Sequence, residues 1–433
     1  MCYARNQHTR SDAVLMPRTS AKPIGSPLPT APLIVSAHEA QIIAALRKHE
    51  TISRTDMARL TGWSRPKVTA EVGKLAKRGI VIESGEGESQ GGRRPRLLRL
   101  NHQLGYIVGV DIGATSMDLA VADLNAQVLA RDCGPADVRD EPLVLLGEVK
   151  RRVLALLAKQ DIRPERVLGV GVGVPGPVDF LKGILVAPPL MPAWEGFSLR
   201  GYFHPVFPSA FIAVDNDVNI MALGELKSGA GMGQEDFIFI KIGTGIGAGI
   251  VCNRVIHRGH NGSAGDIGHI CADHNGPICR CGNVGCLEAL AAGPAIAERA
   301  LTAAQNGSSP ILAQKLVANN GILRAEDVAA AVREGDRAAI EIVQRSGQLI
   351  GDVLAGLVNF FNPSLILVGG GVSNVGNQLL ASIRQAVLHR STALATRELI
   401  VSYSPMGGEA GVTGAIHLAL EHLFVIQDKS SGG

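Results

Sequence analysis

Two segments of the chain share one pattern, and this repetition limits the folds that the chain can adopt. Residues 106–124, YIVGVDIGATSMDLAVADL, and residues 237–256, FIFIKIGTGIGAGIVCNRVI, each read as a buried strand, a Gly/Thr turn and a second strand. Around them, glycine-rich apolar runs alternate with helical stretches, which is typical of an α/β architecture. We therefore expect a duplicated α/β domain that begins near residue 104.

The turns inside these two segments are suited to phosphate groups. Glycine and threonine leave backbone N–H groups and hydroxyls open to a ligand, without bulky side chains in the way. Glycine at a tight hairpin is by itself a sufficient structural explanation of each turn. The repetition of the pattern, rather than either turn alone, favours a fold that closes on a nucleotide.

An amide and a carboxylate stand at a strand–helix junction between the two segments. In VDNDVNIMALGE, residues 214–225, Asn216 and Asp217 fall where a strand ends and a helix begins. Beside a phosphate site, Asp217 can accept the proton of a hydroxyl that attacks a γ-phosphoryl group, while Asn216 holds that hydroxyl in line. Helix capping by Asp215 or Asp217 explains the same residues without catalysis. From this motif alone, helix capping is the favoured interpretation.

Charge is distributed unevenly along the chain. Residues 1–100 carry 17 Lys and Arg against 8 Asp and Glu, whereas the other 333 residues carry 25 against 31. A small basic segment ahead of a larger, mildly acidic one indicates a module that binds a polyanion, joined to a domain with another task.

Residues 36–101 have the pattern of a winged helix-turn-helix domain. A first helical stretch is followed by a second between Ser53 and Gly62. A third runs from Ser64 to Gly79, with an apolar face and a basic one, and two arginine-bearing strands come after it. Solvated basic helices in a three-helix bundle would share the local pattern, but the whole order favours DNA binding.

The candidate DNA-binding residues lie on the third helix and near the tip of the predicted wing. Lysine and arginine there supply affinity for phosphates, and residues early in the helix can reach base edges. They are Ser64, Arg65, Lys67, Thr69, Lys74, Arg78, Arg93, Arg94 and Arg96.

The segment GHICADHNGPICRCGNVGCLEA, residues 268–289, holds two histidines and four cysteines, and one histidine and three of the cysteines have the spacing H-x9-C-x-C-x4-C. The chain has 7 cysteines, an odd number, which fits reduced thiols and a metal better than a disulfide framework. Four N and S ligands with no position left open are typical of a closed, structural Zn²⁺ site. Thiols clustered by chance are the alternative, and Cys271 is the residue most easily mistaken for a ligand.

The chain resembles the ROK family, named for repressors, open reading frames and kinases, from about residue 37 to residue 425. The motifs that carry the resemblance are DIGAT, GVGVPGPVD (171–179), NDVNIMALGE, IGTGIGAG, GDIGH (265–269), CRCGNVGCLEA (279–289) and NPSLILVGGGV (362–372). The resemblance implies an actin/hexokinase-like (ASKHA) duplicated α/β domain, preceded by a winged helix-turn-helix domain as in the family's transcriptional regulators.

The resemblance also implies the residues of three sites. Structural Zn²⁺ is expected on His269, Cys279, Cys281 and Cys286. A sugar is expected on Asn216, Asp217, Asp266, His269 and Glu288. A phosphate or nucleotide is expected, if it binds, on Asp111, Gly113, Thr115, Gly243, Thr244, Gly245, Gly369 and Gly370.

Three positions depart from the pattern of the family's kinases. Asp266 replaces the usual glutamate of the GEIGH motif, which withdraws the carboxylate by one methylene. Ala114 and Ser116 stand where those kinases usually have a second glycine and a lysine. A methyl group takes room where backbone approaches phosphate, and the lost lysine removes positive charge from a phosphoryl-transfer transition state. These departures weaken the case for Mg²⁺-ATP as a substrate.

We interpret the chain as a sugar-responsive transcriptional regulator of carbohydrate metabolism genes, acting as a repressor. The expected partners are operator DNA, a sugar or amino-sugar effector and a second copy in a homodimer or dimer of dimers. An ATP-dependent hexose or N-acyl hexosamine kinase with a DNA-binding head, with Asp217 as base, is the alternative. A zinc-stabilised interaction protein with neither ligand is a third possibility.

The expected organisation has four parts. They are a disordered segment at residues 1–35, the winged helix-turn-helix at 36–101, the ROK-type domain at 104–425 with its zinc loop at 269–286, and a flexible tail at 426–433. The first 35 residues lack the apolar stretch of a secretory signal, and no long apolar run indicates a membrane span, so we expect a cytoplasmic protein.

Overall fold

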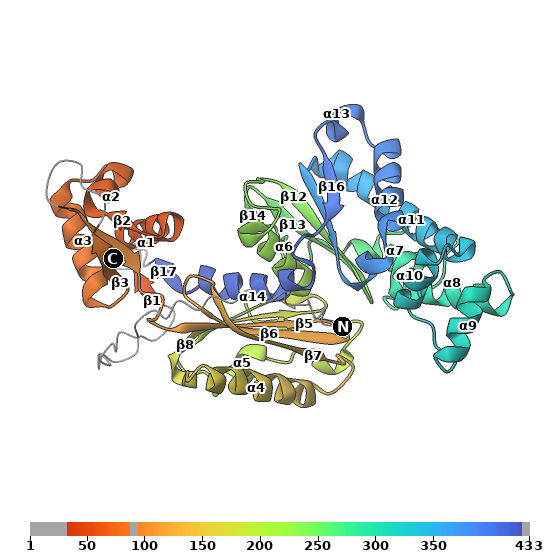
Figure 1. Ribbon diagram of the computed structural model, residues 1–433, viewed down its shortest axis with the longest axis horizontal. Coiled ribbons are helices and arrows are strands. Elements are labelled where there is room, and N and C mark those ends of the chain that lie inside the picture. The colour runs from red at the N-terminus through yellow and green to blue at the C-terminus, as the bar shows by residue number, and fades with distance from the viewer. Residues whose placement is uncertain (1–32, 87–93, 427–433) are drawn as a thin grey trace, which may run out of the picture.

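The computed structural model describes residues 33–86 and 94–426, which form an N-terminal unit followed by two α/β subdomains (Figure 1). Beyond residue 104, strands and helices alternate, as the glycine-rich apolar runs predict. Within the described residues, no helix is both long and apolar enough to cross a membrane.

The N-terminal unit is built from three helices and a small antiparallel sheet. Its elements are β1 (Leu33–Val35), α1 (Ala37–His49), β2 (Ile52–Ser53), α2 (Arg54–Thr61), α3 (Arg65–Lys77), β3 (Val81–Glu86) and β4 (Arg96–Leu100). Ser53 caps α2 by accepting a hydrogen bond from Asp56 N (3.1 Å), and Gly62 ends this helix in the left-handed conformation. Ser64 holds the N-cap position of α3, but its side chain makes no capping hydrogen bond.

Helix α3 packs through the apolar face that its periodicity predicts. Val68, Val72 and Leu75 are fully buried against α1 and the sheet of this unit. The spacing of these residues places them on one side of the helix, whereas Arg65, in its first turn, and Thr69 are exposed to solvent.

The first subdomain is a five-stranded sheet with helices on both faces. Its elements are β5 (Tyr106–Ile112), β6 (Ser116–Asp123), β7 (Val128–Pro135), α4 (Pro142–Lys159), β8 (Val167–Val174), β9 (Val178–Asp179), β10 (Ile184–Leu185), α5 (Leu199–Phe203) and β11 (Phe211–Asn216). The strand order is β11-β8-β5-β6-β7, in which β5 pairs antiparallel with β6 and parallel with β8. Helix α4 covers one face, and α14 (Ala410–Glu421) covers the other (Figure 1).

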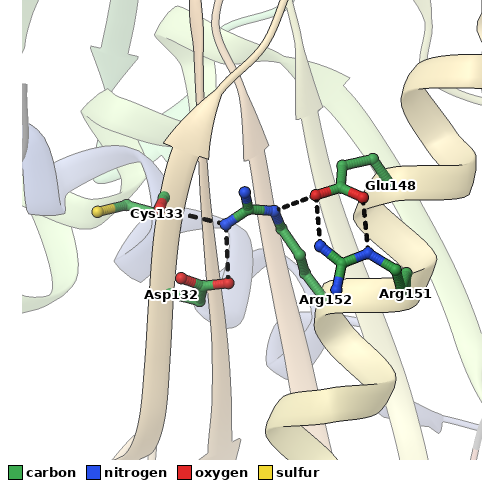
Figure 2. A network of polar contacts seen from close by, with 5 residues as sticks. All are labelled: Asp132, Cys133, Glu148, Arg151 and Arg152. Carbon is green, nitrogen blue, oxygen red and sulfur yellow. Dashed lines mark hydrogen bonds and ion pairs between the residues drawn. The ribbon is translucent and has the colours of Figure 1, made fainter.

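A polar network fastens α4 to the edge strand β7. Figure 2 shows Arg152 of α4 donating hydrogen bonds to the Asp132 carboxylate (3.0 Å), the Cys133 carbonyl (3.4 Å) and the Glu148 carboxylate (2.7 Å). Hydrogen bonds from Arg151 and from Arg152 lower the pKa of Glu148 to about 2. The glutamate therefore remains charged at any physiological pH.

The second subdomain repeats the strand pattern of the first. Its elements are α6 (Asp217–Ser228), β12 (Phe237–Ile242), β13 (Ile246–Cys252), β14 (Val255–Ile256), α7 (Leu287–Ala291), α8 (Gly293–Gln305), α9 (Pro310–Ala318), α10 (Ala325–Arg333), α11 (Arg337–Phe361), β15 (Leu365–Gly369), α12 (Asn377–Arg390), α13 (Ala393–Thr396) and β16 (Ile400–Tyr403). The order is β14-β13-β12-β15-β16, and β12 pairs antiparallel with β13 and parallel with β15, as β5 does with β6 and β8. This is the duplication that the two similar segments predict.

Helices α6 and α14 pack against each other between the two sheets. A side chain at Gly224 or at Gly414 would overlap the backbone of the facing helix, so glycine at these positions allows the close approach. Ile220 and Leu223 of α6 and Leu418 of α14 are buried with residues of both sheets. The two helices therefore form a close-packed contact between the two subdomains.

The ends of the described chain correct two expected boundaries. Residues 33–35 were expected in the disordered segment 1–35, and Ile426 in the tail 426–433. Instead β1 pairs in parallel with β17 (Phe424–Ile426), with Leu33 opposite Phe424. Leu33 and Val35 are buried, so apolar contact with the C-terminal end of the chain orders them.

Candidate functional site

Four side chains of the zinc loop converge on one point. The ligand atoms of His269, Cys279, Cys281 and Cys286 all lie within 4.8 Å of one another. Cys279 Sγ is 3.6 Å from His269 Nδ1, and Cys281 Sγ is 3.6 Å from Cys286 Sγ. Cys271 lies outside the cluster and contacts His274 Nδ1 instead (3.5 Å).

The donor set of this cluster fits a tetrahedral Zn²⁺. Three sulfurs and one nitrogen are the composition of a closed structural site. The second ring nitrogen of His269 lies 3.8 Å from Asp266 Oδ1, which is within ion-pair distance but longer than the hydrogen bond by which a carboxylate orients a ligating histidine. Without a bound cation, burial raises the pKa of Cys279 and raises that of Cys286 to about 12, so a metal would displace protons as it binds.

Two of the candidate sugar residues flank the cluster. Asp266 begins the turn that leads to His269, and about half of its side chain is exposed (51%). Glu288, in the first turn of α7, accepts a hydrogen bond from Ile246 N (3.1 Å) at the start of β13. A side chain at Gly245 would overlap the Glu288 carboxylate, so the glycine of the GTG turn leaves room for it. The structure thus brings Asp266, His269 and Glu288 together around one end of β13.

Asn216 and Asp217 lie at the junction of β11 and α6, as the sequence predicts. Asn216, rather than Asp215 or Asp217, caps the helix: its Oδ1 accepts from Val218 N (2.9 Å), and its Nδ2 donates to Gly176 O (2.8 Å). Within residues 33–86 and 94–426, no hydrogen bond or ion pair joins this junction to Asp266, His269 or Glu288.

Lys241, near the end of β12, is a site residue that sequence reasoning missed. Its ammonium forms an ion pair with the buried carboxylate of Asp217. Burial lowers the pKa of Lys241, but Asp217 and Asp111 outweigh burial, and the net shift is upward. Burial raises the pKa of Asp111 to about 7 against the opposing effect of Lys241. A lysine in an apolar strand carries no local signal of this role, because its partners come from the other subdomain and from α6.

Comparison with known proteins places the chain in a family. The model of the ROK family matches residues 107–422. The chain belongs to the ROK family. A xylose repressor of Caldicellulosiruptor bescii is 28% identical over 404 residues, which cover 90% of this chain and 97% of that protein.

Two solved structures share the ROK fold with this chain. A ROK family transcriptional regulator, a homologue of the E. coli MLC protein, is 24% identical and covers 89% of this chain and 96% of its own, with a TM-score of 0.76. A ROK family glucokinase from Streptomyces griseus in complex with glucose and AMPPNP is 29% identical and covers 73% of this chain and 100% of its own, with a TM-score of 0.63. The predicted actin/hexokinase-like α/β fold is confirmed.

The candidate phosphate residues of the ROK domain fall into two groups. One group, from Gly243 to Gly245 and at Gly369 and Gly370, lies in the second subdomain. There Gly243 N donates to Gly245 O (2.9 Å) across the turn that contains Thr244. Gly370 adopts a φ of 89°, and a side chain there would overlap the backbone of Ile242, just before the turn. Gly369 pairs with Lys241 in the sheet, so both glycines adjoin this turn.

The other group of phosphate candidates, Asp111, Gly113 and Thr115, lies in the first subdomain. Asp111 is at the end of β5, and Gly113 N donates to Ser116 O (2.7 Å) to close the hairpin. Thr115 is exposed at the tip of that hairpin. The two groups therefore belong to the matching hairpins of the two subdomains, as the duplication implies.

The candidate DNA-binding residues divide into exposed and partnered ones. Arg65 and Thr69 are exposed on α3, as are Ser64 at its N-cap and Arg94 before β4. Arg93 lies outside the described residues.

Four basic candidates have partners within the protein. Lys67 Nζ lies 4.4 Å from the centroid of the Trp63 ring and 3.0 Å from His38 Nε2. The other three pair with carboxylates, Lys74 with Glu71 (2.8 Å), Arg78 with Glu39 (3.5 Å) and Arg96 with Glu83 (2.7 Å). A polyanion would have to compete with these partners, so the exposed Arg65 and Arg94 are the basic candidates best placed to contact DNA.

Proposed function

We propose that this ROK protein is a sugar-responsive transcriptional regulator that represses carbohydrate genes by binding operator DNA. The main structural support for the proposal is the parallel pairing of β1 with β17, which attaches the N-terminal unit to the ROK domain. The xylose repressor that matches 90% of the chain supports the same function. The sugar is proposed by class only, as a hexose, pentose or amino-sugar.

The N-terminal unit would act as a winged helix-turn-helix head. Helix α3 presents Arg65 and Thr69 for insertion into a major groove, and the β3–β4 hairpin would lie along the backbone with Arg94 and Arg96. One such module buries little surface, so tight binding requires two heads on a symmetric site. We therefore include a homodimer, or a dimer of dimers, in the proposal.

The sugar would bind beside the zinc loop. Asn216, Asp217, Asp266, His269 and Glu288 offer the carboxylates, amide and imidazole that hold sugar hydroxyls. A structural Zn²⁺ on the Cys/His cluster would fix the loop between Asp266 and Glu288, so that the pocket keeps its shape.

Helix α14 connects the head with the candidate phosphate residue Asp111 and with α6, the helix that begins at the candidate sugar residue Asp217. At its N-terminal end, a side chain at Gly411 would overlap the Asp111 carboxylate, so helix and carboxylate are in close contact. At its C-terminal end, Leu420 O accepts a hydrogen bond from Arg47 of α1 (3.2 Å), and the same guanidinium lies 5.2 Å from the centroid of the Phe424 ring. A sugar that favours one arrangement of the subdomains would move α14, β17, β1 and the head together.

The test of this function is operator binding measured with and without sugar. The DNA upstream of the protein's own gene is titrated in the presence of a panel of hexoses, pentoses and amino-sugars. One sugar is expected to change operator affinity and to raise the melting temperature of the free protein. If the affinity is the same with every sugar that stabilises the protein, the chain is not a sugar-responsive regulator.

Arg65→Ala is expected to weaken operator binding by about 1–3 kcal/mol, because it removes an exposed guanidinium at the start of α3. Fluorescence anisotropy with labelled operator measures the effect. The matched control is Arg337→Ala, whose side chain is 92% exposed on the second subdomain, and its operator affinity should equal that of the wild type. Equal affinities for Arg65→Ala and the wild type would place the reading surface elsewhere.

Asp266→Asn is expected to lower sugar affinity by about tenfold or more, since hydrogen bonds to a charged group are the stronger kind. Half of this side chain is exposed, so the fold should survive the change. Isothermal titration calorimetry gives the affinity, and operator release should need proportionally more sugar. Glu341→Gln, on an exposed face of α11, is the control. An unchanged sugar affinity would remove Asp266 from the pocket.

A further inference from the structure

The ammonium of Lys241 lies in the field of two carboxylates from different parts of the fold. Asp217 is the first residue of α6 and pairs directly with it, while Asp111, at the end of β5, acts on it through space. The side chain of Asp217 is 8% exposed and that of Lys241 is 23% exposed. One internal cation therefore serves acidic groups from both subdomains.

The strand position of Lys241 gives its side chain few other partners. In the sheet it stands opposite Gly247 of β13 and Gly369 of β15, neither of which has a side chain. Phe237 and Phe239, which alternate with it on the same side of β12, are fully buried. A buried charge is costly unless it is paired, so the ammonium is held at Asp217.

This arrangement conflicts with the requirements of phosphoryl transfer. Such transfer needs a base that can accept the proton of the attacking hydroxyl and a divalent cation that neutralises the phosphates. The ammonium pairs with Asp217 Oδ2, so one of the two oxygens that could take the proton is already engaged by a cation. A divalent ion beside Asp217 would meet this fixed positive charge. The residues present therefore do not fit Mg²⁺-ATP, although a similar glucokinase was solved with glucose and AMPPNP.

We propose that Lys241 is an internal cation that takes the place of a divalent metal ion beside Asp217, in the field of Asp111, and so commits this site to binding sugar without transferring phosphate. The proposal deepens the function proposed above and rests on it for the identity of the ligand. The positive charge of Lys241 is part of the protein itself. It balances the acidic side chains when neither a metal nor a nucleotide is bound. Asp217 remains able to accept hydrogen bonds from a sugar hydroxyl through its other oxygen.

The test is Mn²⁺ binding to the zinc-loaded, full-length protein, followed by electron paramagnetic resonance. Lys241→Met removes the charge and keeps the length of the side chain, and Lys241→Arg keeps the charge. Lys241→Met is expected to bind Mn²⁺ at least about tenfold more tightly than the wild type, because one repulsive charge is gone. Lys241→Arg should behave as the wild type. The gain should disappear when Asp111→Asn is added to Lys241→Met.

Two outcomes would overturn the proposal. One is a Lys241→Met protein that binds Mn²⁺ no more tightly than the wild type. The other is a wild-type protein that already binds Mn²⁺ in a manner sensitive to Asp111→Asn. Lys241→Gln, which also removes the charge and keeps a hydrogen-bond donor on a side chain of more similar length, is measured in parallel in case Lys241→Met does not fold. Melting temperature and zinc content identify the folded variants.

The two proposals can fail separately. Operator release by sugar, measured on the wild type, tests the regulator without reference to Lys241. If the wild type responds to sugar but Lys241→Met gains no Mn²⁺ affinity, the regulator proposal stands and the internal-cation proposal is refuted. If Lys241→Met gains Mn²⁺ affinity but no sugar affects operator binding, the internal-cation proposal stands and the regulator proposal is refuted.

Discussion

Cys286→Ser is expected to lose the bound zinc and to lower the free energy of unfolding by at least about 3 kcal/mol, a fraction of the ~10 kcal/mol or more that structural Zn²⁺ contributes to isolated zinc-binding units. Cys286 is fully buried and immediately precedes α7, which carries Glu288. Its Sγ contacts both Cys281 Sγ (3.6 Å) and His269 O (3.7 Å). Losing this ligand therefore releases both ends of the loop.

Atomic emission spectroscopy counts the zinc, and thermal unfolding measures the stability of the same samples. Sugar affinity should fall with the zinc, because Asp266 and Glu288 flank the loop that the metal holds. Cys271→Ser is the matched control: this cysteine is exposed and lies outside the cluster, so zinc content and melting temperature should stay at wild-type values. A zinc-free wild type, or a Cys286→Ser protein with a full zinc content, would refute the assignment.

The cluster could be predicted from the sequence because its ligands lie close together along the chain. Three cysteines within eight positions must be neighbours in space, whatever the fold around them. The same holds for the Asn216–Asp217 junction, where a change from strand to helix marks the place. The duplicated hairpins were equally visible, since each is a local pattern that occurs twice.

The pairs that join distant segments could not be predicted in this way. Lys241 and Asp217 come from different elements, and the apolar run FIFIKI does not say which face of its strand meets α6. Strand β1 has only three residues, and its pairing with β17 brings together opposite ends of the chain. Helical periodicity likewise placed Arg78 on a basic face without revealing Glu39, which partners it from α1. Tertiary contact decides each of these cases.

One such distant pair connects the two subdomains next to Asn216, one of the candidate sugar residues. Arg258 follows β14 of the second subdomain, and its Nε and Nη2 bind Oδ2 of Asp215, at the end of β11 in the first (2.8 and 2.7 Å). Asp215 is 3% exposed, and its other oxygen accepts hydrogen bonds from Asn216 N (2.8 Å) and Asn219 Nδ2 (2.9 Å). The ion pair thus fixes the backbone that presents Asn216.

Arg258→Met is expected to cost about 3–5 kcal/mol of stability, the usual penalty for leaving one charge of a buried pair without its partner. The guanidinium also lies 4.1 Å from the centroid of the Phe180 ring, a contact that the methionine would keep only in part. Chemical denaturation measures the loss. Because Asn216 would lose its anchored neighbour, sugar affinity should fall as well, whereas operator affinity without sugar should change less.

A double-mutant cycle separates the ion pair from general disruption of the fold. If the unpaired carboxylate of Asp215 causes the loss, Asp215→Asn should recover part of the stability when it is added to Arg258→Met. Arg254→Met is the matched control, because Arg254 is exposed on the same stretch of chain and donates one long hydrogen bond to Gln234 O (3.4 Å). Its stability should stay within about 0.5 kcal/mol of the wild type. Equal losses for Arg258→Met and Arg254→Met would show that the pair with Asp215 makes no special contribution to stability.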